Sequence, residues 1–484
     1  MKKNLGVNVI YQTLYQIFLT LTPLITTPYV SRVLGVEGVG TYSYTLSVRK
    51  YFMLFAMLGV ADYGCRSIAS VRDDKDELSK EFSNIFSLQF ISSFLSITVY
   101  FLYCFFIVKT DFNIALLQGM MVISCAFDIS WFFFGIEKIG VTVTRGVLIK
   151  IVTMVLTFTI VNKNTGVAAY TIAMAGGLLV SQLSLWLCIK NEINFVKPTW
   201  NEMIKHIKPN LVLFVPVIAQ SVFQLMDKSM LGWFSTKSQS GYYYNVDMIV
   251  NIPEGIIGGF GTVFFARLSA LYADSNYNEI NNVLNQSIEL YTCVASALVF
   301  GIDGIIKEFV PLFFGEEFIP CVYLTYMLSP VILIKAYSTL LKYEVFIPCN
   351  SEKYYTFSVI VAAIINCFVN GFLIPIYGAA GAIIGTIAAE LGELIVLIYG
   401  FKRIDLNFSF NAIKSYSIYY VFALIMFGCV RLVSVINVSI FFKVVLEVFT
   451  GVIIYSCLCL MYWKYHKSSV LDVFAGMIKR GDNK

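Results

Sequence analysis

The sequence predicts an all-α polytopic membrane protein with about 14 transmembrane helices, arranged as two six-helix bundles related by a pseudo-two-fold axis and followed by two further helices. Hydrophobic residues make up 58% of the chain and charged residues 13%, whereas soluble proteins carry about 25% charged residues. Apolar runs of about 20 residues recur along the whole length, and each can cross roughly 30 Å of hydrocarbon. Strict alternation of polar and apolar residues is absent, so these runs are predicted to be helices.

Fourteen predicted spans follow from the positions of these apolar runs, each of which ends at polar or charged residues. In the first half the spans are 8–30, 40–61, 84–108, 113–134, 143–162 and 166–189. In the second half they are 210–233, 242–264, 284–306, 319–341, 355–376 and 379–400, and the last two spans are 415–434 and 440–462.

An amphipathic connector is predicted between the two halves. Trp200, Ile204 and Ile207 are interspersed with lysines there, a pattern typical of a segment on the membrane surface. Because six spans precede it, the second bundle re-enters the membrane with the same polarity as the first, which makes a parallel repeat. The predicted parts are an N-terminal bundle (1–190), the connector (191–209), a C-terminal bundle (210–401) and helices 13 and 14 with a basic tail (402–484).

The repeat is most visible at two glycine-containing turns. The stretch TPYVSRVLGVEGVGTYSY, residues 27–44, joins the first two spans. About two hundred residues later Leu231, Gly232 and Gly241 repeat the arrangement, as expected of a doubled structural unit. Arginines that follow the second and the eighth span support the same register. The residues that we predict to act at gates or turns are Arg32, Gly35, Arg66 and Arg267.

Basic residues of the short loops are concentrated on one side of the predicted membrane. If the N-terminus is cytoplasmic, the opposite side receives only Arg32, Lys109, Lys163, Lys237 and Lys307. Lys and Arg are enriched on the cytoplasmic side of membrane proteins. The sequence therefore predicts a multi-pass cell-membrane protein with both termini in the cytoplasm.

Polar residues form stripes on the first two spans of each half. Charges inside a membrane cost about 2.5–3.5 kcal/mol each on insertion scales, so each requires a partner, a wet cavity or a function. The simplest arrangement turns the four stripes toward a hydrated cavity shared by the two halves. The alternative is that the charges are buried helix contacts, with Asp227 neutralising Arg49, or Asp247 and Glu254 holding Lys50.

Cations and amides of these stripes, with Lys335 of the tenth span, are the candidate ligands of an anionic substrate. The predicted substrate-binding residues are Arg49, Lys50, Lys228, Lys335, Gln12, Gln220, Gln224 and Asn251. The acids could carry a coupling ion, although Glu390 and Glu393 fit a structural pairing equally well. The ion-coupling candidates are Asp227, Asp247, Glu254 and Glu390.

No cofactor, metal site or nucleic-acid partner is expected. The eleven cysteines lie mostly inside apolar runs and the chain has two histidines, without the paired spacing of a disulfide framework or a zinc site. The net charge of +5 comes from basic residues at membrane borders. A nucleotide-binding loop is absent, and coupling to a proton gradient, a sodium gradient or the membrane potential stays open.

Several stretches resemble the Wzx-type polysaccharide repeat-unit flippases of bacteria, which belong to the multidrug/oligosaccharidyl-lipid/polysaccharide exporter superfamily. They are residues 27–44, YFMLFAMLGVADYGCRSIA from Tyr51, DKSMLG from Asp227, GYYYNVDMIVNIP and FFARLSALYAD. The resemblance covers nearly the whole chain, and the last two spans contribute little to it.

The resemblance implies two six-helix bundles around a V-shaped cavity in a bacterial inner membrane. It also implies alternating access that moves an undecaprenyl-pyrophosphate-linked oligosaccharide from the cytoplasmic to the outer leaflet, for a capsule, an O-antigen or another surface polymer. The expected partners are this lipid-linked oligosaccharide, membrane lipid, a polysaccharide polymerase and glycosyltransferases. We expect a monomer that is not an enzyme.

Two other functions compete with this interpretation. A drug or metabolite cation antiporter of the same superfamily would carry an acid in the first span, and this chain has none there. A membrane glycosyltransferase or polymerase would need sizeable outer loops with acids or histidines, whereas the predicted outer loops are short.

Overall fold

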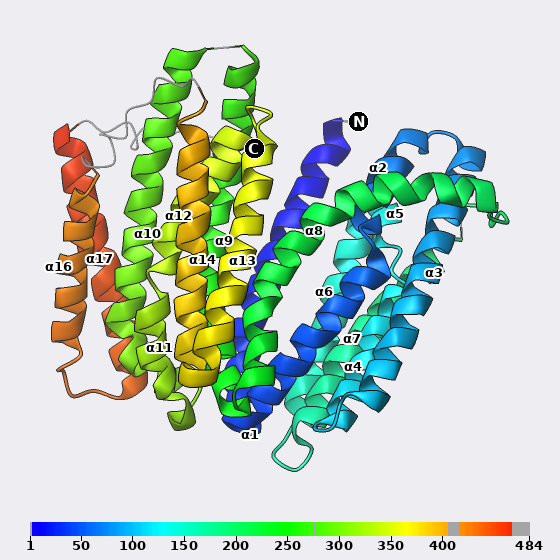
Figure 1. Cartoon of the computed structure of the whole chain (residues 1–484). Helices are drawn as coiled ribbons and strands as arrows, with labels where there is room; N and C mark the ends of the chain where they lie inside the picture. The colour runs from blue at the N-terminus through cyan, green and yellow to red at the C-terminus, as the bar shows by residue number, and fades with distance from the viewer. Residues whose placement is uncertain (1, 191, 275, 405–415, 467–484) are drawn as a thin grey trace. The chain divides into compact units, whose positions relative to one another are not determined.

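The computed structural model describes residues 2–190, 192–274, 276–404 and 416–466 (Figure 1). The described residues form helices joined by short turns and contain no strand, so the predicted all-α class is confirmed. Within this part of the chain nine helices are long and apolar enough to cross a membrane, or ten if the bent helix Trp200–Phe234 counts as one span. The predicted spans fall on helices or broken helix pairs, with the first two spans sharing α1 on either side of Gly35, so the predicted number is consistent with the structure.

Contacts divide the chain into two compact units, Met1–Gly241 (unit 1) and Tyr242–Lys484 (unit 2). The predicted four-part organisation, with its boundary at the connector, stays a prediction.

Unit 1 is built around its first helix, which packs against α3, α4, α6, α7 and α8. Its helices are α1 (Lys2–Met57), α2 (Val60–Val71), α3 (Lys75–Phe106), α4 (Phe112–Cys125), α5 (Ser130–Gly135), α6 (Ile139–Ile160), α7 (Gly166–Cys188) and α8 (Trp200–Phe234). Aromatic residues of α3 and α5, among them Phe82 and Trp131, form a buried cluster against α2. This cluster fixes the short helices α2 and α5 on the rest of the unit.

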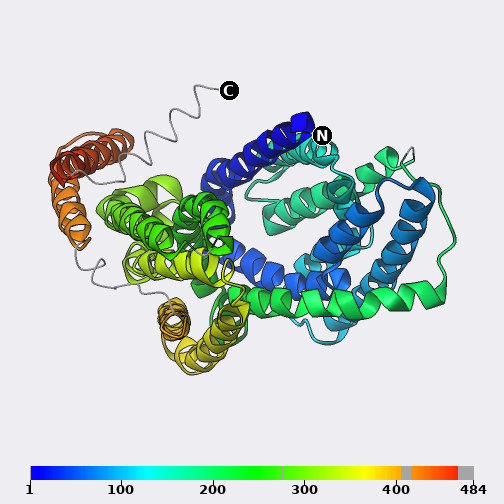
Figure 2. The same ribbon diagram turned by 90° about the horizontal axis from the view of Figure 1, so that it is seen from above.

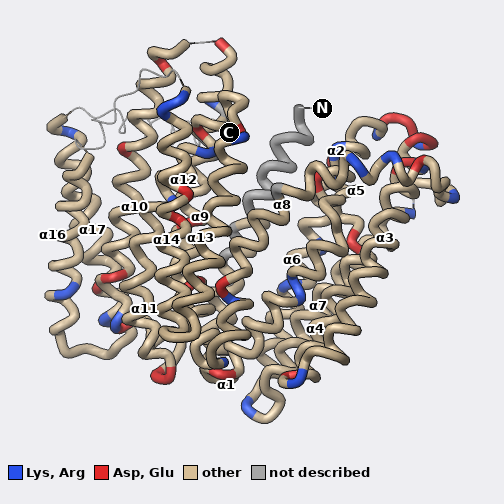
Figure 3. Tube along the Cα trace, viewed as in Figure 1, with Lys and Arg blue, Asp and Glu red and all other residues tan. Residues whose placement is uncertain are grey.

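Unit 2 contains most of α9 (Lys237–Ala273) and the remaining helices. They are α10 (Tyr277–Phe313), η1 (Glu316–Phe318), α11 (Pro320–Leu328), α12 (Val331–Leu340), the π-helix η2 (Leu341–Phe346), α13 (Glu352–Tyr377), α14 (Ala379–Phe401), α16 (Ile418–Val433) and α17 (Ile440–His466). Figure 2 shows α16 and α17 at the edge of this unit, where both pack against α10. Charged residues gather near helix ends in both units, and the middle of most helices carries few of them (Figure 3).

The turn predicted at Gly35 is present inside α1. Gly35 has φ 65° and ψ 179°, a conformation that glycine adopts without the steric cost of a Cβ atom. Close backbone packing follows beside this turn. A Cβ atom on Gly40 would lie 3.0 Å from the backbone nitrogen of Gly241, and a Cβ atom on Gly241 would lie 3.2 Å from that of Gly40. Gly40 of the first glycine-containing turn and Gly241 of the second therefore lie in close contact inside unit 1.

Two spans predicted as continuous helices are interrupted. In unit 1 the chain breaks between α4 and α5, where the amide nitrogen Nε2 of Gln89 donates to the carbonyls of Cys125 (2.7 Å) and Asp128 (2.8 Å). Gln89 also accepts a hydrogen bond from Nε1 of Trp131 at 2.8 Å. Irregular backbone inside a membrane protein is tolerated where side chains form hydrogen bonds with the backbone groups that have lost their helical partners. In unit 2 the corresponding break between α11 and α12 contains Pro330, which has no N–H to donate.

The connector and the seventh predicted span form one helix in the structure. The helix α8 begins at Trp200 and bends by 46° between Trp200–Val215 and Val217–Phe234. The sequence has Pro216 at this point, and sharp bends occur at prolines. Sequence reasoning separated the two segments because lysines interrupt the apolar pattern. The buried face of Met203, His206 and Asn210 makes the first segment part of the packed unit.

Candidate functional site

A cavity of about 420 Å³ lies within unit 1 and brings predicted site residues together. Three of the predicted substrate ligands, Arg49, Lys50 and Gln224, line it. They come from α1 and α8, which are far apart in sequence but pack against each other. The polar lining consists of Arg49, Lys50, Asp62, Asp128, Ser221 and Gln224.

The charged residues that line this cavity lie on helices and on the non-helical segment between α4 and α5. Arg49 is buried on α1, with 6% of its surface exposed, and its neighbour Lys50 is exposed. Asp128 lies at the break between α4 and α5, where its Oδ1 accepts a hydrogen bond from the backbone nitrogen of Ser130 at 2.9 Å. This contact holds the carboxylate in place next to the cavity. The cavity therefore combines two cations with two carboxylates, since Asp62 of α2 also lines it.

A second polar cluster lies within unit 2 and is built around Lys335 of α12. Lys335 forms an ion pair with Glu254 of α9 and lies 3.6 Å from a carboxylate oxygen of Glu390 on α14. Seven residues after Lys335, Lys342 pairs at 2.6 Å with Glu393, which lies one turn after Glu390 on α14. Lys335 thus belongs to a network with two ion-coupling candidates. This geometry corresponds to the paired alternative of the sequence analysis, with Lys335 rather than Lys50 as the partner of Glu254.

The other predicted ligands are distributed over α8 and α9. Gln220 and Asn251 are exposed, and Lys228 is half-buried. Asp227 is buried on α8, whereas Asp247 is half-buried on α9. The side chain of Gln12 lies outside the described part of the structure. Binding and coupling roles for all of these residues stay predictions.

The predicted gate residues differ in their surroundings. Gly35 forms the turn in α1 described above, and Arg32 and Arg66 are exposed. Arg267 pairs with Glu279 at 2.7 Å, which joins the end of α9 to the start of α10. Their action as gates stays a prediction.

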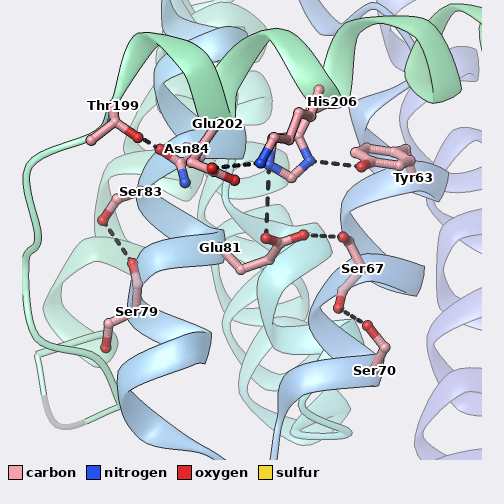
Figure 4. A network of polar contacts seen from close by, with 11 residues as sticks. Tyr63, Ser67, Ser70, Ser79, Glu81, Ser83, Asn84, Thr199, Glu202 and His206 are labelled. Carbon is pink, nitrogen blue, oxygen red and sulfur yellow. Dashed lines mark hydrogen bonds and ion pairs between the residues drawn. The ribbon is translucent and has the colours of Figure 1, made fainter.

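A polar network around His206 was not found by sequence reasoning (Figure 4). Nδ1 of His206 lies 2.7 Å from the hydroxyl of Tyr63 on α2, and Nε2 lies 3.7 Å from a carboxylate oxygen of Glu81 on α3. The other oxygen of Glu81 accepts a hydrogen bond from Ser67. Nearby, Asn84 accepts from the backbone nitrogen of Thr199 at 3.2 Å. The network fastens the first segment of α8 to α2 and α3.

Charged pairs between loops support the same end of unit 1. Arg72 pairs with Glu137, and Lys138 pairs with Glu192 at 2.5 Å. The hydrogen bond that the Arg72 guanidinium donates to the Glu137 carboxylate raises the pKa of Arg72. These residues link the loop after α2, the loop after α5 and the segment before α8.

Three buried acids of unit 2 also escaped the sequence analysis. Glu289 accepts a hydrogen bond from the hydroxyl of Tyr419 at 2.6 Å, and Glu344 accepts one from Ser287 at 2.5 Å. Neither carboxylate oxygen of Glu447 has a hydrogen-bond partner among the described residues. The available signal was an acid within or directly after an apolar run, because Glu289 and Glu447 lie inside predicted spans and Glu344 lies three residues after one; such an acid marks a functional candidate in a membrane protein.

All eleven cysteines are free thiols in the structure. Two of them, Cys293 and Cys459, have their sulfur atoms 3.8 Å apart inside unit 2, a distance well beyond the length of a disulfide bond.

The long apolar helices, the broken spans and the buried charges define a multi-span membrane protein of the transporter type. The Polysaccharide biosynthesis protein family matches residues 5–272. The chain belongs to this family, and the resemblance to the Wzx-type flippases is thereby confirmed.

Individual proteins agree with this assignment. The chain is 22% identical over 406 residues to an Escherichia coli (strain K12) protein described as "Putative O-antigen transporter", a match that covers 80% of this chain and 94% of the relative. Its fold is similar to that of the lipid II flippase MurJ in an inward closed conformation, with a TM-score of 0.76, 13% identity and coverage of 95% and 100% of the two chains. An inward-facing multidrug resistance MATE family transporter of the MOP superfamily has a TM-score of 0.62 at 15% identity, with 82% and 95% covered.

Proposed function

We propose that this protein moves a lipid-linked oligosaccharide across the cell membrane as a transporter without enzymatic activity. The proposed substrate is an undecaprenyl-pyrophosphate-linked repeat unit, which passes from the cytoplasmic to the outer leaflet by alternating access. The observation that carries this proposal is the cavity of unit 1, where Arg49 and Lys50 of α1 lie beside amide and hydroxyl groups of α8. The family and the O-antigen transporter relative support it.

The chemistry of the cavity suits the head of such a molecule. Arginine forms two parallel hydrogen bonds with phosphate, and lysine adds a compact positive charge. Gln224 and Ser221 supply donors and acceptors for sugar hydroxyls. The volume of about 420 Å³ lies within the usual range of small-ligand sites, roughly 300–1,000 Å³. The cavity is thus large enough for a pyrophosphate and part of a sugar, while the lipid tail remains in hydrocarbon.

Unit 2 is proposed to supply energy coupling through the cluster of Lys335, Glu254 and Glu390. Two carboxylates face one ammonium group there, so an added proton or cation would change the network's charge balance. A charge that crosses 100 mV gains about 2.3 kcal/mol, enough to bias a conformational equilibrium. The coupling ion is left to experiment.

An antiporter of cationic drugs is the second candidate, because Asp62 and Asp128 also line the unit 1 cavity. Carboxylates attract cations, whereas the pair Arg49 and Lys50 repels them. A flippase substrate would therefore require Arg49 and Lys50, whereas a cationic drug would require Asp62 and Asp128.

Export of surface polysaccharide in cells that lack their own copy of the gene tests both candidates. We expect Arg49→Gln to abolish surface polysaccharide and to leave the lipid-linked precursor on the cytoplasmic side, at normal protein levels in the membrane. Lys163→Gln, which changes an exposed lysine of a unit 1 loop, is the matched control and should export normally. Normal export by Arg49→Gln would contradict the flippase proposal. Drug sensitivity that follows Asp128→Asn instead would favour the antiporter.

The proposed cellular setting is the inner membrane of a bacterium, with both termini in the cytoplasm and with glycosyltransferases and a polymerase as partners in the same process. A cysteine introduced near the N-terminus should react with a membrane-impermeant thiol reagent only after the membrane is opened. Reaction in intact cells would reverse the proposed orientation.

A further inference from the structure

A groove of about 350 Å³ lies on unit 2 between α10, α16 and α17 and holds an acid that the proposed function does not use. Its walls are almost wholly apolar, and small residues such as Gly301 and Gly451 leave the space open. Glu447 of α17 lines this groove and is fully buried, with 0% of its surface exposed. An ionised carboxylate in such a place, without a hydrogen bond, would cost several kcal/mol.

Two polar side chains in or beside the groove have hydrogen-bond partners other than Glu447. On α16, Nη1 of Arg431 donates to a carboxylate oxygen of Glu308 at 2.8 Å and to the carbonyl of Gly304 at 3.0 Å. The hydroxyl of Tyr455, which also lines the groove, donates to the carbonyl of Cys293 at 2.7 Å. Among the described residues no ion pair or hydrogen bond compensates Glu447.

The charges around the groove leave one acid in excess. The guanidinium of Arg431 forms an ion pair with Glu308 of α10, and its positive charge also acts on Glu447 of α17. Lys443 lies one turn before Glu447 on α17 and is half-buried, and its charge also acts on Glu447, although the two side chains form no ion pair among the described residues. Asp303, five residues before Glu308 on α10, lies beside Ser329 at the break between α11 and α12.

We propose that Glu447 is a reversible proton-binding site. In the conformation described here the carboxyl group is neutral and holds one proton, taken from water. It releases this proton to water when Arg431 turns from Glu308 toward Glu447, because the guanidinium then compensates the new carboxylate. The site lies seven residues from the first residue of α17, which corresponds to about 10 Å along the helix. Exchange with water near that helix end therefore requires only a short path.

This inference does not depend on the substrate proposed above, because it concerns a proton on one named side chain. The full-length protein in lipid nanodiscs, studied by infrared difference spectroscopy over a series of pH values, tests it. We expect a neutral-carboxyl C=O stretching band that is present near neutral pH, disappears as the pH rises, and is lost in Glu447→Gln. Above the midpoint, each further pH unit should reduce the band about tenfold.

Three variants sharpen the test. Arg431→Gln removes the cation that would stabilise the ionised form of Glu447, so the band should persist to higher pH. Glu308→Gln frees Arg431 to pair with Glu447, so the band should be confined to lower pH. Glu289→Gln changes a buried acid of the same unit that already accepts a hydrogen bond from Tyr419, and it should leave the band unchanged. Glu447→Asp keeps the acid and should retain a band at a shifted frequency if the glutamine variant does not fold.

Two results would overturn the proposal. Spectra of the wild type and Glu447→Gln that agree at every pH would show that Glu447 carries no proton. A band that is lost in Glu447→Gln but stays constant over the whole pH range would show a permanently neutral structural acid instead of an exchanging site.

Discussion

The two units place basic residues in contrasting surroundings. In unit 1, Arg49 and Lys50 line a cavity of about 420 Å³ whose wall also contains amide and hydroxyl groups. In unit 2, Lys335 is enclosed by Glu254 and Glu390. A cation beside open space can meet a ligand, whereas a cation held by two carboxylates mainly compensates charge that would otherwise be buried. Basic residues of the two units thus support different roles, and the following variants test the distinction.

The largest effect on stability is expected at Lys335. Lys335→Met leaves Glu390, which is 3% exposed, without its cation, and breaking a buried pair in this way costs about 3–5 kcal/mol. Thermal unfolding of the purified protein should show a clear loss in Tm. The triple variant Lys335→Met, Glu254→Gln, Glu390→Gln removes the stranded charges and should recover most of it. Equal losses in both variants would mean that the lysine does not act through its carboxylate partners.

A smaller effect is expected where Gly40 and Gly241 lie in close contact. Gly241→Ala places a Cβ atom against the backbone of Val36 and Gly40, and overpacking of this kind costs about 1–3 kcal/mol. Gly255→Ala is the matched control on the same helix, because a Cβ atom there meets nothing within 4 Å. The difference in Tm between these two variants reports the cost of placing a Cβ atom at the close contact of the two backbones. A stable Gly241→Ala protein would show that the backbones can separate freely.

The His206 network should contribute no more than the glycine contact, and its effect should be confined to a defined segment. His206→Phe keeps a ring at this position, removes the hydrogen-bond partner of Tyr63 and leaves Glu81 with Ser67 alone; losing the partner of a buried polar group costs about 1–3 kcal/mol. Hydrogen exchange should become faster in Trp200–Val215 and remain unchanged in α17. Uniform change along the whole chain would argue against a local fastening role.

The smallest effect is expected at Arg72, which pairs with Glu137 on the surface of unit 1. Exposed ion pairs contribute little because water and salt screen them. Arg72→Gln should leave Tm unchanged within error, both at low and at high salt. A salt-dependent loss would indicate that the loop pairs act as a connected network with Lys138 and Glu192.

Several features of the site were accessible from residue patterns. Charges inside apolar runs marked Arg49, Lys50 and Lys335 as exceptional, since membranes exclude unsatisfied charges. The pairing of Lys335 with Glu254 and Glu390 was not accessible, because it joins α12, α9 and α14 across long stretches of sequence. His206 was also missed, since a single histidine among lysines carries no motif and acquires its partners only when α8 packs on α2 and α3.

Composition and hydrophobic runs by themselves determined that this chain is an all-α membrane protein, because hydrocarbon admits only long apolar helices with satisfied backbones. The sequence also determined the turn at Gly35, because glycine is the residue type that adopts these backbone angles without steric cost. Tertiary structure alone decided where the spans break at Asp128 and Pro330, which charges face a cavity, and which acid remains without a partner. These properties depend on distances between helices, and a distance between helices is set by the packing of side chains that lie far apart along the chain.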